Sequence, residues 1–288
     1  MSVENNELHV KSVQALSTGK GSQHPEHRFG SWKPSLWWLL MSRQWIEIPI
    51  LVYVIEHRDG LVLFDAGMDA AILSDPHYIA SPIGRFIARK LFRLNITRDD
   101  TLANKMSDLG YDVADVRKVI ISHLHFDHIG CIKEVPQADL LVSETEWRQL
   151  DTPHPERDFI LREHIELPGA KWCQIEFQPT DDPVLAPFGR CHDVMGDGSV
   201  VLVPTPGHTV GSLSMLMRTR GFPPMLFVGD LTYDSELLMS NQLPGTGDKK
   251  QLLASFAKVQ KLKRDLPDLL ILPTHDGTVP DTLAKARV

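Results

Sequence analysis

Short runs of apolar residues divide the first half of the chain into candidate strands and one candidate helix. Runs rich in Val, Ile and Leu predict strands because they are short and are bounded by polar or turn-forming residues. Asp59 and Gly60 separate two of these runs and favour a tight hairpin. Leu102, Met106 and Leu109 recur at helical spacing. The pattern predicts strands at 8–16, 48–56, 61–67, 116–121 and 138–143, and a helix at about 100–110.

The second half of the chain has the same layout. Apolar runs predict strands at 200–205, 212–218, 225–229 and 269–273. Between the last two strands, residues 249–264 carry apolar side chains at helical spacing and predict a helix. Two halves that are each rich in strands and then helical indicate an α/β fold in which a pair of sheets lies between helices.

Two segments interrupt this layout. Residues 28–46 contain four tryptophans without a clear period, so we expect this segment to be loop-like. Residues 70–98 contain an amphipathic portion after Pro82. For both segments the alternatives are packing in the core, or a lid, a substrate pocket or a subunit interface.

Length and charge narrow the class of protein. The 288 residues fit one large α/β domain that spans residues 1–288. A net charge of −7 argues against a nucleic acid or an anionic membrane as partner. The densest basic run, at 89–93, is expected to be one face of a helix.

The chain also lacks the usual signals of export and membrane insertion. Its longest apolar stretches, at 37–41 and 48–55, fall short of the roughly 20 residues that span a bilayer. The N-terminal sequence does not have the basic-then-apolar order of a signal peptide. The three cysteines have no paired spacing, which suits a reducing compartment. We therefore expect a soluble cytoplasmic protein.

Four side chains of metal-ligand type stand within six positions, directly after the predicted strand at 116–121. They are His123, His125, Asp127 and His128. His123 and His125 are two residues apart, so both imidazoles point to one side of an extended segment. Asp127 and His128 follow where the chain should turn into a helix. Such a dense cluster after a buried strand favours a metal site over isolated surface histidines.

Three further candidate ligands follow other predicted strands. His208, Asp230 and His275 come just past the strands that end near residues 205, 229 and 273. The chain thus places five histidines and two aspartates at the same end of four strands, where α/β folds hold their active sites. This number of ligands is enough for two metals with open positions. Five other histidines, His24, His27, His77, His154 and His164, have no partners at metal spacing.

At these positions the chain resembles the metallo-β-lactamase superfamily. The residues that carry the resemblance are H-L-H-F-D-H (123–128), T-P-G-H-T (205–209), G-D (229–230) and T-H-D (274–276), with F-D-A-G (64–67) upstream. Their order and spacing match over most of the chain. The pattern is specific for the fold and less specific for the substrate, because the superfamily hosts many reactions.

The resemblance implies a four-layered αββα fold with a dinuclear metal site. By position, the first metal would be bound by His123, His125 and His208, and the second by Asp127, His128 and His275, with Asp230 bridging. Nitrogen-rich ligation with shared carboxylates suits zinc, while iron, manganese and cobalt remain alternatives. Relatives with an oxo-bridged di-iron centre have Glu at the position of His125, so the histidine favours hydrolysis.

Within the superfamily, the chain is similar to the N-acyl homoserine lactonases, the quorum-quenching branch. Tyr233, three residues after Asp230, stands where that group places a catalytic tyrosine. The similarity implies a small-molecule lactone substrate whose ring is opened by hydrolysis. A tyrosine packed in the core is the alternative interpretation of Tyr233.

The chemistry of such a site is coherent. Two cations would hold a bridging water and lower its pKa to roughly 7, and the hydroxide would attack the lactone carbonyl. Tyr233 would donate a hydrogen bond to the developing oxyanion. Asp127 is a candidate proton shuttle in addition to its place among the ligands. Asp65 is expected to orient a ligand.

Other functions remain open on the same residues. The centre could hydrolyse thioesters, aryl esters or phosphotriesters, although no basic cluster is evident for the carboxylates of a glutathione thioester. A non-enzymatic metal-binding scaffold is a third alternative. The presence of all seven ligands argues against it, because scaffolds that have lost activity typically lose ligands. The apolar insertions also make a homodimer plausible.

Overall fold

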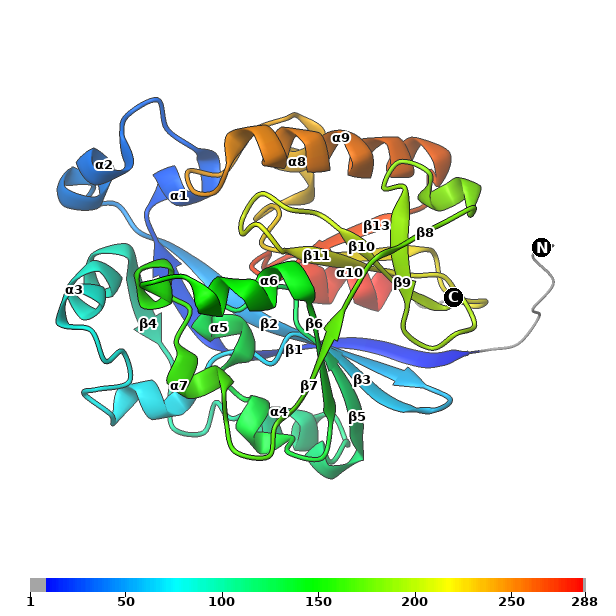
Figure 1. Ribbon diagram of the computed structural model, residues 1–288, viewed down its shortest axis with the longest axis horizontal. Helices are drawn as coiled ribbons and strands as arrows, with labels where there is room; N and C mark the ends of the chain where they lie inside the picture. Colours follow the sequence, from blue (N-terminus) through cyan, green and yellow to red (C-terminus); the bar gives the residue numbers. More distant parts are fainter. Residues whose placement is uncertain (1–8, 287–288) are drawn as a thin grey trace.

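Two β-sheets lie face to face between layers of helices (Figure 1). The computed structural model describes residues 9–286, apart from the side chains of Ser35, Leu36 and Leu39, so Leu8 of the first predicted strand lies outside the described residues. In spatial order, the strands described in the first sheet are β4 (Phe92–Asn95), β1 (Val10–Gln23), β2 (Ile46–His57), β3 (Gly60–Phe64), β5 (Val116–Ile120), β6 (Asp139–Ser143) and β7 (Lys171–Ile175). Those of the second sheet are β13 (Leu270–Pro273), β12 (Met225–Gly229), β11 (Leu213–Met217), β10 (Val200–Pro204), β9 (Arg190–Asp193) and β8 (Gln178–Pro179).

Helices cover the outer face of each sheet. In Figure 1, α9 runs along the second sheet, whereas α4, α5 and α7 lie on the side of the first sheet. The α-helices are α1 (Pro25–Phe29), α2 (Ser35–Met41), α3 (Pro82–Leu91), α4 (Leu102–Asp108), α5 (Phe126–Ile129), α6 (Glu144–Trp147), α7 (Arg162–Ile165), α8 (Ser235–Met239), α9 (Lys249–Asp265) and α10 (Val279–Lys285). Within residues 9–286, no helix combines the length and the apolar character needed to cross a membrane.

Apolar side chains fill the spaces between these layers. Between the two sheets, the rings of Tyr53 and Phe227 lie 4.8 Å apart, centroid to centroid, beside Phe64. Leu102 and Met106 of α4 are fully buried against the first sheet. The corresponding contacts of α9 with the second sheet come from Leu252, Phe256, Val259 and Leu262. The layers therefore follow the order helix, sheet, sheet, helix, which confirms the predicted αββα fold class.

The structure corrects the prediction for residues 28–46. This segment is not a loop throughout, because it contains the end of α1 and the whole of α2. Neither helix has a side-chain N-cap, and α2 is seven residues long, so the sequence lacks the start signals and the length from which a helical period can be recognised. The amphipathic portion after Pro82 is α3, with Ser81 as its N-cap.

The direction of the strands gathers the candidate ligands at one edge of the molecule. β3, β5 and β6 are parallel to one another in the first sheet, and β12 is parallel to β13 in the second. Because the carboxyl ends of parallel strands meet at the same edge, loops that follow them converge there. The cavity described below lies at this edge.

Candidate metal centre

The loop after β5 supplies four of the seven predicted ligands. His125 has an extended backbone (φ −67°, ψ 149°) and is the N-cap residue of α5, so the strand direction continues through His123 and His125. Their facing nitrogens, His123 Nε2 and His125 Nδ1, lie 3.0 Å apart. The turn into α5 then brings Asp127 and His128 together, with Asp127 Oδ1 3.9 Å from His128 Nε2. The sequence-based prediction of a strand followed by a helix is thus confirmed.

The other three predicted ligands come from loops of the second sheet. His208 follows β10, Asp230 follows β12 and His275 follows β13. Gly229 directs Asp230 into the site with a left-handed backbone (φ 56°), and a Cβ atom at Gly229 would lie 2.8 Å from the Cβ of Ser122. Only glycine fits such a position without strain.

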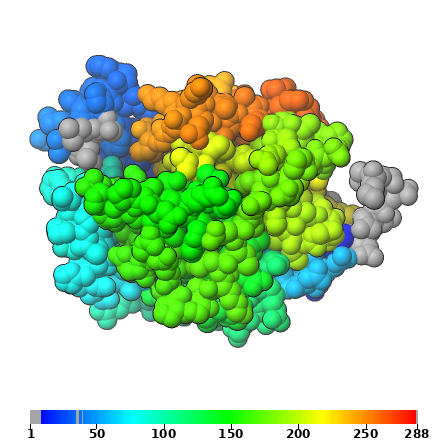
Figure 2. All heavy atoms as spheres, viewed as in Figure 1, coloured from blue at the N-terminus to red at the C-terminus, as the bar shows by residue number. Residues whose placement is uncertain are grey.

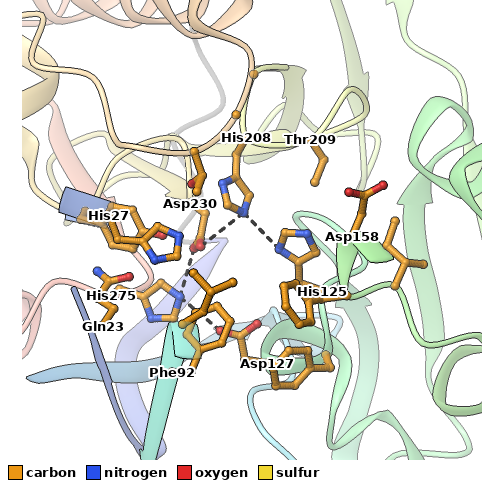
Figure 3. A pocket seen from close by; sticks show the side chains of 18 of the residues that line it. Gln23, His27, Phe92, His125, Asp127, Asp158, His208, Thr209, Asp230 and His275 are labelled. Carbon is orange, nitrogen blue, oxygen red and sulfur yellow. Dashed lines mark hydrogen bonds and ion pairs between the residues drawn. The ribbon is translucent and has the colours of Figure 1, made fainter. Parts of the chain in front are cut away.

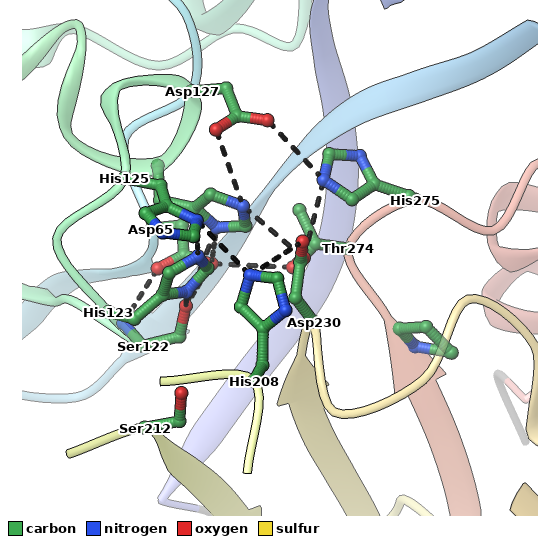
Figure 4. A network of polar contacts seen from close by, with 12 residues as sticks. Asp65, Ser122, His123, His125, Asp127, His208, Ser212, Asp230, Thr274 and His275 are labelled. Carbon is green, nitrogen blue, oxygen red and sulfur yellow. Dashed lines mark hydrogen bonds and ion pairs between the residues drawn. The ribbon is translucent and has the colours of Figure 1, made fainter. Parts of the chain in front are cut away.

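The seven side chains fall into overlapping groups (Figure 4). The ligand atoms of each group lie within 4.8 Å of one another. The first group consists of His123, His125 and His208, and the second of Asp127, His128 and His275. His123, His128 and Asp230 form a third group that overlaps the other two.

Asp230 lies between the two groups. Its Oδ1 is 3.3 Å from both His128 Nε2 and His275 Nε2. Its Oδ2 is 3.6 Å from His208 Nε2. Each carboxylate oxygen therefore faces a different group, as a bridging ligand requires.

Hydrogen bonds on the far side of the rings hold two of the histidines in position. His275 Nδ1 donates to the carbonyl oxygen of Pro49 at 2.8 Å, and His128 Nδ1 donates to Asp65 Oδ2 at 2.8 Å. Asp65 itself has a left-handed backbone (φ 62°) and also accepts from Ser122 N at 2.8 Å. Such partners fix the tautomer, so the Nε2 lone pair of each ring faces the cluster. Asp65 thus has the orienting position expected from the sequence.

A buried carboxylate joins the two ligand loops. Glu146, fully buried at the start of α6, accepts from Leu124 N at 3.0 Å and from Gly211 N at 3.1 Å. Thr209 Oγ1 also donates to it at 2.7 Å. Glu146 therefore ties the loop that carries His123 and His125 to the loop that carries His208.

Three buried polar atoms of the cluster form no hydrogen bond among the described residues. They are His128 Nε2, His208 Nδ1 and Asp230 Oδ1, although the first and the last lie 3.3 Å apart as an ion pair. Leaving such atoms unpaired in the interior costs about 1–3 kcal/mol each unless another group satisfies them. A metal ion is such a group, because imidazole nitrogen and carboxylate oxygen are its ordinary ligands. The residues of the centre therefore fit divalent metal ions.

The three histidines of the first group have lowered pKa values, which favours binding of a cation. Burial lowers the pKa of His123 well below its ordinary value, and the neighbouring His128 adds to the effect. Burial also lowers the pKa of His125, and it takes that of His208 to about 3. These three imidazoles are neutral at neutral pH, the state in which histidine offers a lone pair to a metal.

The carboxylates in and around the second group stabilise positive charge on its histidines. Burial alone would lower the pKa of His128, but Asp230, Asp65 and Asp127 raise it well above the ordinary value. For His275 the effect of burial is likewise outweighed by Asp230, which raises the pKa. Burial opposes ionisation of Asp230, yet His275 and His128 hold its pKa well below the usual range. A divalent cation would supply the same positive charge in place of the two protons.

A cavity of about 360 Å³ opens onto the cluster (Figure 3). His125, Asp127, His208, Asp230 and His275 all line it. One wall is apolar and consists of Ile48, Leu91, Phe92, Phe126, Phe159 and Ile160. The site therefore combines a group of metal-ligand side chains with an apolar surface, as small-molecule sites commonly do.

Tyr233 lines the same cavity. Its ring stacks on that of His275 with centroids 5.7 Å apart, and the side chain is buried. Burial raises the pKa of the Tyr233 phenol well above its ordinary value, and Asp230 adds to this, so the hydroxyl keeps its proton.

The sequence did not single out two other residues of the site. His27 of α1 lines the cavity, its Nδ1 has no hydrogen-bond partner, and burial lowers its pKa to about 4. Its distance along the chain from every ligand hid this position. Glu146 had one recognisable signal, because it stands three residues after the strand that ends at Ser143, at the same edge as the ligands.

The match to a known family agrees with this geometry. The pattern that describes the metallo-beta-lactamase superfamily matches residues 45–275, and the chain belongs to that superfamily. The chain is 29% identical over 247 residues to the N-acyl homoserine lactonase AttM of Rhizobium johnstonii, a match that covers 83% of this chain and 86% of the relative. It is 32% identical over 253 residues to a Mycobacterium bovis protein named "Probable metallo-hydrolase Mb2322c", covering 82% of this chain and 76% of that one.

Solved structures share the fold. An N-acyl homoserine lactone hydrolase with the product N-hexanoyl-L-homoserine bound at its catalytic metal center superimposes with a TM-score of 0.75. The two chains are 22% identical, and the match covers 98% of each. AidC, a dizinc quorum-quenching lactonase, gives a TM-score of 0.59 at 16% identity, covering 95% of this chain and 92% of AidC.

Proposed function

We propose that this protein is a dinuclear metal-dependent hydrolase that opens the lactone ring of N-acyl homoserine lactones. The observation that carries the proposal is the pair of ligand groups with Asp230 between them, next to Tyr233 and an apolar cavity wall. The similarity to AttM, an N-acyl homoserine lactonase, supports the choice of substrate.

The metals would be held as the two groups suggest. His123, His125 and His208 would bind one ion, Asp127, His128 and His275 the other, and Asp230 both. We assign zinc to the site because mixed imidazole and carboxylate ligation suits Zn²⁺. When bound, the two ions would polarise the ester carbonyl and lower the pKa of water, so that a nucleophile exists at neutral pH.

Tyr233 would stabilise the oxygen that becomes negative during attack on the lactone. Because burial raises its pKa well above the ordinary value, the phenol keeps its proton and acts as a hydrogen-bond donor. Donors of this kind are worth about 2.7–4 kcal/mol of transition-state stabilisation when they are fixed in place. The stacking of Tyr233 on His275 fixes the ring.

Asp127 would transfer a proton from the attacking water to the leaving alkoxide. Its side chain is 21% exposed, whereas those of Asp230 and His128 are 5% and 0% exposed, so among these three it has the most access to the cavity. Its Oδ2 lies 3.5 Å from His275 Nε2. A carboxylate at this position could take a proton on attack and return it to the leaving alkoxide.

The cavity wall suits an acylated substrate. The apolar side chains of Leu91, Phe92 and Phe126 offer a surface for an acyl chain, and His27 offers an unpaired ring nitrogen near the cluster. Arg157 is the only Lys or Arg among the described residues that line the cavity. A glutathione thioester, with its free carboxylates, would therefore find little complementary charge.

The test is a substrate panel on metal-replete protein. Acid release should be followed for N-acyl homoserine lactones of several acyl lengths, beside thioesters, aryl esters and phosphotriesters. We expect the lactones to be the fastest class, and we expect Tyr233→Phe to lower kcat for them by roughly 10²-fold. The proposal fails if lactones of every length are inert while two metals are bound, or if another class is hydrolysed faster.

A further inference from the structure

The surface formed by α2, α3 and the residues around them has a composition that the proposed hydrolysis does not explain. Large apolar side chains are exposed there, with Trp32 at 89% and Ile83 at 67% exposure. The full apolar set is Trp32, Trp37, Leu40, Met41, Ile83 and Phe86. We call this the basic aromatic surface, together with the cations Lys33, Arg43, Arg89, Lys90 and Arg93.

Its charge is opposite to that of the chain as a whole. Residues 31–46 and 81–98 contain seven Lys or Arg and no Asp or Glu, in a chain whose net charge is −7. The five cations of the basic aromatic surface make no ion pair in the part of the chain that the structure describes. The positive charge is therefore concentrated and uncompensated.

The two segments form one continuous surface. α2 and α3 contact each other, and Figure 2 shows their blue and cyan surfaces adjoining at one end of the molecule. The Arg93 guanidinium lies 4.1 Å from the ring centroid of Trp45, which links β4 to the end of the tryptophan-rich segment. Lys33 Nζ lies 3.4 Å from the ring centroid of Trp37.

Acidic residues near this surface are occupied elsewhere. Glu26 accepts a hydrogen bond from Ser42 Oγ at 3.0 Å, and Glu47 pairs with Lys20 at 2.6 Å. Asp75 accepts from the backbone of His77 at 2.7 Å. None of the three is paired with a cation of the basic aromatic surface in the described residues.

We infer that the basic aromatic surface docks this protein on an anionic lipid bilayer. α3 has the arrangement of a helix that lies in the membrane interface, with Ile83 and Phe86 on an apolar face beside Arg89 and Lys90. Aromatic rings and long basic side chains are favoured at the level of the lipid headgroups. The overall negative charge argues against such a partner, but attraction acts over about one Debye length, roughly 10 Å, so the local charge decides.

The same charge disfavours a second copy of this chain as the occupant. A two-fold dimer places the same patch of both subunits in contact. The cations of one basic aromatic surface would then face those of the other, with no acidic side chain to pair them. Exposed aliphatic residues such as Leu40 and Met41 also favour acyl chains over the stacked bases of a nucleic acid.

Docking would bring the cavity close to the lipid. Leu91 and Phe92 directly follow Lys90 in the chain and line the cavity. His24 Nε2 lies 2.9 Å from the backbone oxygen of Lys90, so the C-terminal end of α3 contacts the N-cap residue of α1. The surface and the cavity are therefore neighbours.

The test is sedimentation of the full chain with vesicles. Phosphatidylcholine vesicles that contain phosphatidylglycerol should carry the protein into the pellet, neutral phosphatidylcholine vesicles should carry less, and high salt should release it. The double variant Arg89→Glu, Lys90→Glu should lower the partition coefficient by at least about 10-fold. Ile83→Ser with Phe86→Ser should lower it without a change of charge.

A control with the same change of charge is available on α9. Lys261 and Arg264 are exposed cations of α9, and reversing both changes the net charge by the same amount. This control should bind vesicles like the unchanged protein. The inference is overturned if the protein stays in the supernatant with anionic vesicles, or if the α3 variant binds as well as the α9 control. It is also overturned if the α3 variant changes the sedimentation mass without lipid, because the surface would then be a subunit interface. None of these readouts depends on catalysis.

Discussion

Histidine and aspartate side chains gather at both ends of β1. At one end, where Gln23 lines the cavity, lie the seven side chains of the metal centre. At the other end lies what we call the distal cluster, formed by His9, His57 and Asp197, whose ligand-type atoms also lie within 4.8 Å of one another. By residue type and spacing alone, both clusters could hold a metal.

Their hydrogen bonds distinguish them. Asp197 Oδ1 accepts from Ser199 N at 2.9 Å, and Asp197 Oδ2 lies 3.4 Å from the Arg58 guanidinium, a positive charge that would repel a metal cation. His57 Nδ1 accepts from Asp59 N at 3.2 Å. The neutral ring therefore carries its proton on Nε2, the nitrogen that faces Asp197, and has no lone pair there for a metal. His9 Nδ1 also lacks a hydrogen bond, but it lies 2.7 Å from Asp197 Oδ2 as an ion pair. The positive charge of Arg58 and the proton on His57 Nε2 are therefore what disfavour a metal in the distal cluster.

Replacing the aspartate of each cluster by asparagine should give the largest difference in activity between the metal centre and the distal cluster. Asp230→Asn removes the charge that both ligand groups share, so we expect lactone turnover to fall by at least roughly 10³-fold. Bound metal should fall below two ions per chain. Asp197→Asn is the matched control, and it should leave turnover and metal content unchanged. Equal losses in the two variants would break the distinction between the clusters.

Glu146 should matter most for stability. Glu146→Ala leaves the buried Leu124 and Gly211 N–H groups without an acceptor, so we expect the free energy of unfolding to fall by about 2–5 kcal/mol. Denaturant unfolding of the metal-free protein measures this. Glu146→Gln, which keeps an acceptor oxygen, should lose less. If Glu146→Ala left the free energy of unfolding unchanged, the ligand loops would not need the support of Glu146.

The distal cluster should respond to mutation through stability alone. Asp197→Asn weakens charge-assisted contacts with Ser199 and Arg58, which points to a loss of about 1–3 kcal/mol in the free energy of unfolding. Denaturant titration of this variant and of Asp230→Asn, both metal-free, separates the two roles. Metal addition should stabilise the Asp197 variant more than the Asp230 variant.

His27 lies outside both clusters, in the wall of the cavity. It is buried and has an unpaired nitrogen, like the metal ligands, but it belongs to neither ligand group. We therefore expect it to contact substrate, and His27→Phe should lower kcat/KM by about 10-fold through one lost hydrogen bond. Metal content should stay at two ions per chain. Loss of a metal in this variant would place His27 among the ligands instead.

The smallest effect is a pH dependence of stability in the distal cluster. Burial lowers the pKa of His57 in the folded protein, although nearby Asp197 acts in the opposite direction. Below about pH 6.5 the unfolded chain binds a proton that the folded protein does not, so the free energy of unfolding falls as the pH falls. Thermal unfolding across this range should show a shallower decline for His57→Gln. A steeper decline would reverse the sign of the shift.

Much of the fold could be predicted because its central strands are short and mainly apolar. β10 and β12 are almost wholly buried, whereas β5 buries Val116, Val119 and Ile120 and exposes Arg117. The positions of all three strands were predicted within a residue or two. β1 was harder, because its second half, Ser17–Gln23, is polar and pairs with β4 near the sheet edge. α1 and α2 were missed because short helices without caps have no readable period.

The ligand positions could be predicted because each ends a recognisable strand. The supporting residues could not, since Glu146 and His27 act through contacts between segments that are far apart in the chain. The distal cluster escaped notice for the same reason. The nature of the metal and the role of each ligand remain predictions.

Anomalous diffraction from crystals of the metal-replete protein would locate the metal ions. We predict two metal peaks per chain, one among His123, His125 and His208 and one among Asp127, His128 and His275, with Asp230 in contact with both. No peak should lie beside His9, His57 and Asp197. A single peak at the centre, or a peak in the distal cluster, would show that the proposed dinuclear site is wrong.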